Sequence, residues 1–192
     1  MRNRSHLIPV RYRGAGLIEV SISLLILSIG VLGLGSLQMS SKRLGHEAMQ
    51  RTEAALLASD LLERIRANRN ALPGYSTSGL GAGVGEPSAM PLPDCNGNRC
   101  SAAQLSSWDL WRWEQALNGA TTSDGAGGLV RPSACVDVDG RSVTIEIVWQ
   151  GFRSLGSPDD EPADAPGCGA GNYGSDAAAL QWLRVSSWIG EE

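Results

Sequence analysis

Residues 11–41 read RYRGAGLIEVSISLLILSIGVLGLGSLQMSS, and the fold prediction starts from this stretch. From Val20 to Ser41 it holds 22 consecutive residues without a charged side chain. As a helix these residues would rise about 33 Å, enough to cross the ~30 Å hydrocarbon core of a bilayer. The arginines on the N-terminal side favour a cytoplasmic N-terminus and an exported C-terminus. The stretch therefore predicts one membrane-spanning helix ahead of an exported domain.

Three simpler interpretations compete with this prediction: a buried core helix, a cleaved secretory signal and an ordinary single-span anchor. The run is too long and too uniformly apolar for a core helix. No small-residue cleavage site follows it, as a secretory signal would require. Glu19 distinguishes a functional helix from an ordinary anchor, because a carboxylate near mid-bilayer costs about 2–3 kcal/mol and therefore calls for a function.

The residues around Glu19, Arg13–Val20, read RGAGLIEV and resemble the processing site of type IV prepilins. In that family a dedicated peptidase cuts after a glycine and leaves the apolar stretch on the mature chain. The resemblance implies that residues 1–14 are a leader, that the bond between Gly14 and Ala15 is cut, and that Ala15 is N-methylated. It also implies that Glu19 serves assembly by pairing with the N-terminal amine of a neighbouring subunit, since a buried carboxylate is tolerated only when paired. The sequence departs from the family at Ala15, where Phe is usual, and in having no proline in the span.

The transmembrane or filament-core helix is expected over residues 15–40, and residues 41–72 have the spacing of an amphipathic helix that continues into a head. Its apolar face is expected to carry Leu44, Ala48, Ala55, Ala58, Leu62 and Ile65. Asn68, Asn70 and Pro73-Gly74 supply a stop signal. Residues 56–68, LLASDLLERIRAN, resemble the pilus-modification (PilV) group of minor pilins.

The head is expected over residues 73–192, and its four cysteines predict two disulfides in an exported protein. Cys95 and Cys100 flank four residues containing Asn-Gly, a turn that a disulfide could close. A zinc site is the alternative there, but it lacks the usual spacing and histidines. Three connectivities are open from the sequence, and proximity favours pairing Cys95 with Cys100 and Cys135 with Cys168.

A helix is predicted over residues 102–117, and its segment 108–113, WDLWRW, again resembles the pilus-modification group. Its tryptophans could stack on a sugar or on a partner protein, but core packing is the favoured interpretation. Trp113 falls off the apolar face and is expected to be partly exposed.

Strands are predicted over residues 134–138 and 142–149, joined by a turn at Asp139-Gly140, and over residues 180–189. In the last strand, Leu183 and Val185 should share one side. Residues 73–100 and 153–179 are expected to be loops. The second loop carries four acids that could hold calcium, although a solvated loop is favoured. These acids are Asp159, Asp160, Glu161 and Asp164.

Composition restricts the function. Without residues 1–14 the chain has 12 basic and 20 acidic residues, a net charge of −8. An acidic body argues against a nucleic-acid partner. The only histidines are His6 and His46, neither in the head, so Ser-His-Asp and Cys-His catalytic sites are unavailable there. We expect no enzyme, no metal site and no cofactor.

Together these features predict an α+β, pilin-like fold: a long N-terminal hydrophobic helix packed against a small antiparallel sheet head with disulfide-bonded loops. The resemblance implies a minor pilin that primes or modifies a type IV pilus and so acts in adhesion or twitching motility. Its implied partners are other minor pilins, the major pilin, the prepilin peptidase and the inner-membrane assembly platform. It would cross the bacterial inner membrane once, with its head in the periplasm, before joining a surface pilus. The alternatives are a type II secretion pseudopilin and a pilus-tip adhesin that uses exposed tryptophans.

Overall fold

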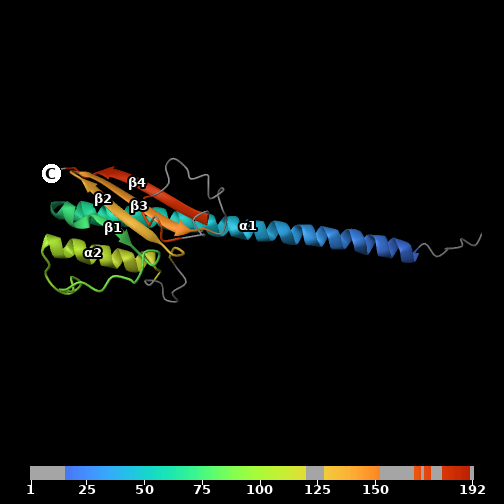
Figure 1. The fold of residues 1–192 in the computed structure, drawn as a ribbon. Helices are drawn as coiled ribbons and strands as arrows, with labels where there is room; N and C mark the ends of the chain where they lie inside the picture. The colour runs from blue at the N-terminus through green and yellow to red at the C-terminus, as the bar shows by residue number, and fades with distance from the viewer. Residues whose placement is uncertain (1–15, 120–127, 152–166, 170, 174–178, 191–192) are drawn as a thin grey trace, which may run out of the picture. The chain divides into compact units, whose positions relative to one another are not determined.

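The computed structural model describes residues 16–119, 128–151, 167–169, 171–173 and 179–190. The long helix α1 (Gly16–Ala67) comes first along the chain, as Figure 1 shows. The 3-10 helix η1 (Arg69–Tyr75) follows it. The remaining elements are β1 (Thr77–Leu80), α2 (Ala102–Leu117), β2 (Ser133–Asp139), β3 (Ser142–Gln150) and β4 (Leu180–Trp188). The chain divides into two units, Met1–Leu44 and Gly45–Glu192.

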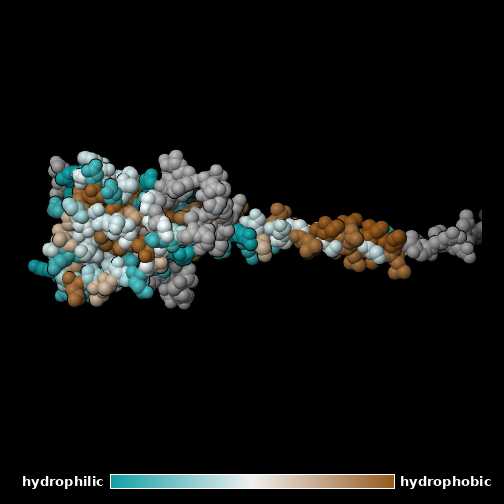
Figure 2. All heavy atoms as spheres, viewed as in Figure 1, coloured by the Kyte–Doolittle hydropathy of each residue, from teal (hydrophilic) through white to brown (hydrophobic). Residues whose placement is uncertain are grey.

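The first unit contributes the N-terminal part of α1, whose side chains from residue 16 to residue 44 are all exposed. Its apolar side chains form a long hydrophobic surface (Figure 2). An 18-residue window of α1 has a mean hydropathy of 2.4 and no buried residue, so the helix is long and apolar enough to cross a membrane. The hydroxyls of Ser21 and Ser28 donate to the carbonyls of Leu17 and Leu25 in the preceding turn, which satisfies them without water.

The second unit is a four-stranded antiparallel sheet in the order β1-β2-β3-β4, with α1 and α2 on its inner face. The inner face of β3 buries Val143, Ile145, Ile147 and Trp149. Leu183 and Val185 of β4 pack against the same core, as their alternation predicts. This α+β arrangement, with a long apolar N-terminal helix, a small antiparallel sheet and two disulfides, is the pilin-like fold that the sequence predicts.

The face of α1 that enters this core differs from the prediction. The buried residues are Ala54, Leu57, Ala58, Leu61, Leu62 and Ile65. Leu44, Ala48 and Ala55 are exposed, so their assignment to the apolar face was wrong. Leu57 and Leu61 lie at the centre of the buried face, which is shifted by one residue from the predicted face. This shift is favoured because a leucine gains more from burial than an alanine.

Two short elements follow α1 where the sequence predicted the end of one continuous helix, up to residue 72, and then a loop. Residues 69–75 form η1 through Pro73, and they bury Leu72 and Tyr75. Residues 77–80 form β1, which pairs with β2 across an irregular register. Tertiary partners stabilise both elements, which have little propensity of their own.

The β2–β3 turn is also one residue from its predicted place. Asp139 pairs with Ser142, so the two-residue loop is Gly140-Arg141 and not Asp139-Gly140. Gly140 has φ +58°, while Arg141 keeps a negative φ. A glycine at the first of two loop positions suits a hairpin turn that needs a positive φ only there.

Candidate functional site

Glu19 is the first charged residue of α1, and it lies in the first helical turn with its side chain exposed. An acid in this position is stabilised by the positive end of the helix dipole. The next charge along the helix is Lys42. Gly14 and Ala15, the predicted cleavage and methylation residues, lie outside the described part of the chain. The structure therefore places Glu19 at the head of an uncharged, exposed helical surface.

The two motif segments that carry the resemblance meet in one buried polar network in the second unit. Asp109, from the WDLWRW segment, accepts a hydrogen bond from the Tyr75 hydroxyl at 2.6 Å and from an Arg64 Nη1 at 3.3 Å. Arg64 also pairs with Asp60 at 2.8 Å. Asn68 donates to the Tyr75 hydroxyl at 3.1 Å and to the Ala102 carbonyl at 2.8 Å. The network thus ties α2 to the end of α1 and to η1.

The electrostatics of this network favour fixed protonation states. Burial, followed by the hydrogen bond to Asp109, raises the pKa of Tyr75 well above its ordinary value, so its hydroxyl stays a donor. Burial alone would lower the pKa of Arg64, but its bonds to Asp60 and Asp109 outweigh this effect and raise the pKa. These groups hold three segments together, and their geometry suits a structural role.

The tryptophans of α2 mostly pack into the core. Trp113 is fully buried and its indole N–H donates to the Leu57 carbonyl at 2.8 Å, so its predicted exposure was wrong. Trp108 is buried and lies 5.0 Å from Trp111 between ring centroids. The buried face of α2 also carries Ser106 and Asp109, and these polar residues hid the true face from a hydropathy pattern. An adhesin that uses exposed tryptophans therefore cannot rely on Trp113 or Trp108.

Sequence reasoning missed Glu114, a carboxylate that is 2% exposed on α2. One of its oxygens accepts from the backbone N–H of Gly81 and the other from the N–H of Ser88, both at 3.0 Å. The side chain therefore fastens the segment after β1 to α2. No local pattern marks Glu114, because its partners lie 26 and 33 residues away.

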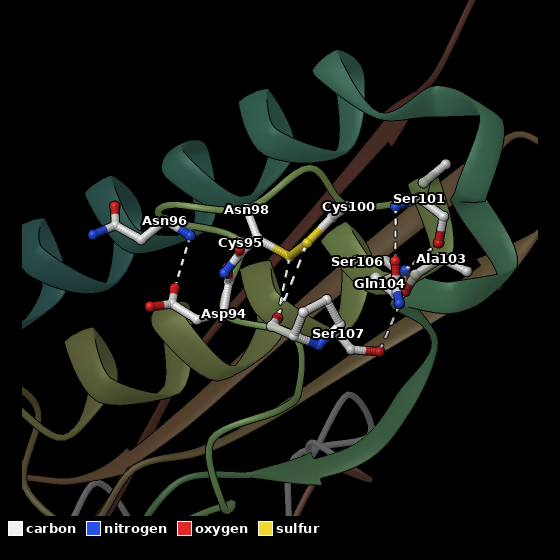
Figure 3. Close-up of a disulfide and its surroundings, with 12 residues drawn as sticks. Asp94, Cys95, Asn96, Asn98, Cys100, Ser101, Ala103, Gln104, Ser106 and Ser107 are labelled. Carbon is white, nitrogen blue, oxygen red and sulfur yellow. Dashed lines mark hydrogen bonds between the residues drawn. A yellow bond between two sulfur atoms is a disulfide. The ribbon is translucent and has the colours of Figure 1, made fainter.

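The four cysteines form Cys95–Cys100 and Cys135–Cys168, with Cα–Cα distances of 5.7 Å in each pair. Figure 3 shows the first bridge in the turn that leads into α2, where Asp94 accepts a hydrogen bond from the Asn96 N–H. Because the sulfurs of Cys95 and Cys100 are bonded to each other, neither is a thiolate that could bind zinc. The acids of the predicted calcium loop, residues 159–164, lie outside the described residues.

Comparison with known proteins gives one family. Residues 36–111 match the Tt1218-like family, described as type IV pilin Tt1218. No curated protein and no solved structure matches the chain significantly. The matched region includes Arg64, Asn68, Tyr75 and Asp109, the members of the buried network. This match and the pilin-like fold together support a type IV pilin-like protein.

Proposed function

We propose that this chain is a minor pilin, cut between Gly14 and Ala15 and N-methylated on Ala15, that enters a type IV pilus through its N-terminal helix. The observation that carries the proposal is the placement of Glu19. It is the only charged residue from residue 16 to residue 41, on a helix whose described side chains are all exposed there.

The apolar surface can be covered in two ways, by lipid before assembly and by other pilin helices after it. In either environment Glu19 is costly unless a cation pairs with it. The best-placed cation is the amine of Ala15 on a neighbouring subunit, which exists only after the leader is cut. Pairing of this kind would link processing to assembly and would fix the axial register between subunits.

The finer assignment to the pilus-modification group is supported by the second unit. Segments 56–68 and 108–113 each resemble that group, and Arg64, Asn68 and Asp109 from these segments belong to one hydrogen-bonded network. The role would be to prime or modify the filament together with other minor pilins, the major pilin and the assembly platform. It involves no catalysis.

In this proposal the subunit crosses the inner membrane once, with the unit Gly45–Glu192 in the periplasm, and later lies in a surface pilus. The periplasm would allow Cys95–Cys100 and Cys135–Cys168 to form.

The test compares Glu19→Ala with Ser21→Ala, a neighbouring exposed residue of the same helix whose loss removes no charge. Both variants should be processed and should keep the same head melting temperature. Only Glu19→Ala should fail to enter pili or to support normal piliation, measured by pilus counts and by immunoblots of sheared pili. Normal piliation with Glu19→Ala would refute the pairing role.

Processing is tested separately by intact-mass analysis of the membrane form, which should begin at methylated Ala15. Gly14→Val should block cutting because its branched side chain crowds the position before the scissile bond. A mature chain that begins at Met1 would contradict the proposed cleavage.

A further inference from the structure

The outer face of the sheet, opposite the helices, ends in an exposed tryptophan. Of the six tryptophans in the chain, only Trp188, the last residue of β4, is exposed, at 69%. Val185 and Leu183 of the same strand lie on the opposite, core-facing side of the sheet. Trp188 therefore contributes nothing to the core of the second unit.

The strand register places polar side chains on one side of this indole, because β4 is the edge strand of the sheet. Trp188 pairs with Ser142, and Ser142 pairs with Asp139, so one row across three strands carries all three on one face. The adjacent row has Asp137, Thr144 and Ser186. The hydroxyl oxygens of Thr144 and Ser186 lie 2.9 Å apart, which confirms their common face. We call these six residues the outer platform.

The two carboxylates of the outer platform have no partner among the residues that the structure describes. Asp137 and Asp139 are exposed, and neither side chain forms a hydrogen bond or an ion pair with another described residue. The next row differs, because Glu146 pairs there with Arg184 at 3.0 Å. The open hydrogen-bonding capacity of the outer platform thus lies on β2, which is separated from Trp188 on β4 by one strand.

The backbone that presents Trp188 is held on both sides. Ser187 accepts a hydrogen bond from Arg66 of α1 at 3.0 Å. After Trp188, the Ile189 N–H donates to the Arg141 carbonyl at 2.9 Å, and the Arg141 guanidinium donates to the Gly190 carbonyl at 3.2 Å. A site whose backbone is already ordered loses less entropy when it binds.

The chemistry of the outer platform fits a carbohydrate. A pyranose ring presents a face of C–H groups that can lie on an indole, and its hydroxyl rim can donate to carboxylates and exchange hydrogen bonds with Ser and Thr. An apolar protein surface would be a poor ligand for the outer platform, because five of its six residues are polar. A cation is usually held by a cage of several rings, and the platform has one.

We propose that the outer platform binds a neutral carbohydrate, a hexose or N-acetylhexosamine unit, with its ring on Trp188 and its hydroxyls on Asp137 and Asp139. Acidic sugars are disfavoured because their carboxylate would meet two like charges. This inference does not depend on the assembly role of Glu19, and its test is a binding measurement that needs no pilus.

The test uses the full chain in a detergent without a sugar headgroup. Cellotetraose, chitotetraose, 3′-sialyllactose and tetramethylammonium are titrated by calorimetry, while acrylamide quenching of tryptophan fluorescence reports access to Trp188. Cellotetraose or chitotetraose should bind and reduce quenching, and 3′-sialyllactose should bind more weakly. Trp188→Ala should abolish binding, and Trp188→Phe should retain part of it because a ring remains.

Matched controls separate the outer platform from general surface effects. Asp137→Asn and Asp139→Asn should each weaken binding by up to about tenfold, the order expected for one hydrogen bond to a charged group. Glu86→Gln, at another exposed acid, and Leu92→Ala, at an apolar side chain 82% exposed, should change nothing. The proposal is overturned if neither tetrasaccharide binds, if only tetramethylammonium binds, or if Trp188→Ala binds like the wild type.

Discussion

Replacing Asp109 by alanine removes the acceptor at the centre of the buried network. The Tyr75 hydroxyl, on a residue with no exposed surface, loses its 2.6 Å bond. A buried donor left without this partner costs about 1–3 kcal/mol. Arg64 loses its 3.3 Å contact but keeps Asp60, and its side chain is 32% exposed, so this part adds less than about 1 kcal/mol. The total expected loss of unfolding free energy is about 1–4 kcal/mol.

The measurement is urea unfolding of the unit Gly45–Glu192, which contains every core residue that the structure describes as buried. Asp60→Ala is the matched control, because it removes the exposed partner of the same arginine and should cost under about 1 kcal/mol. A double-mutant cycle of Asp109→Ala with Tyr75→Phe isolates the buried bond and should give a coupling energy of about 1–2 kcal/mol. Additivity within about 0.5 kcal/mol would refute the reasoning, since the two groups would then be energetically independent.

Three further predictions concern the same unit. Removing Cys135–Cys168, with a sequence separation of 33, should lower the free energy of unfolding by about 4 kcal/mol. Removing Cys95–Cys100, with a separation of 5, should lower it by about 2 kcal/mol. Equal losses in urea unfolding of the paired alanine variants would contradict the dependence on loop length. Burial raises the pKa of Tyr75 and of Tyr173, so the stabilisation that these two groups contribute should be fully present below pH ~10 and be lost as the pH rises above it. Ultraviolet titration should then show no phenolate near that pH while the unit stays folded. Gly83→Ala should cost about 1–3 kcal/mol, because its Cβ would lie 2.6 Å from the Tyr173 hydroxyl and 2.7 Å from the Arg131 carbonyl. Gly97→Ala, with no atom within 4 Å of the added carbon, should leave the melting temperature unchanged.

Local signals in the sequence were enough to predict the two α-helices. The long uncharged run predicted the apolar part of α1, and the bounds of α2, Ala102–Leu117, agree with the prediction because Ser101 and Gln104 form a capping box before a periodic segment. The alternation of β3 and β4 was sufficient to identify their core faces. The disulfide pairs in the structure are those that proximity favoured.

Interactions between residues that are distant in sequence could not be predicted from such local signals. Asp109 and Glu114 are buried because Tyr75, Gly81 and Ser88 satisfy them, and none of these partners is near in sequence. Because these polar residues lie on the buried face of α2, the hydropathy pattern assigned that face wrongly. Trp113 was therefore predicted to be exposed. The outer platform was missed for a related reason: alternation predicts which side Trp188 takes, but only the strand register brings Ser142 and Asp139 beside it.

The bridge between Cys135 and Cys168 determines how the folded unit responds to a single cut in its chain. Its two cysteines enclose all of β3 and the segment that follows it. A protease that cuts the chain once between residues 151 and 167 would leave two fragments joined by this covalent bond. β3 would also remain paired with β2 and β4 on either side. The head should therefore survive a single nick in that segment intact, which reducing electrophoresis of the protein would reveal as two bands and non-reducing electrophoresis as one.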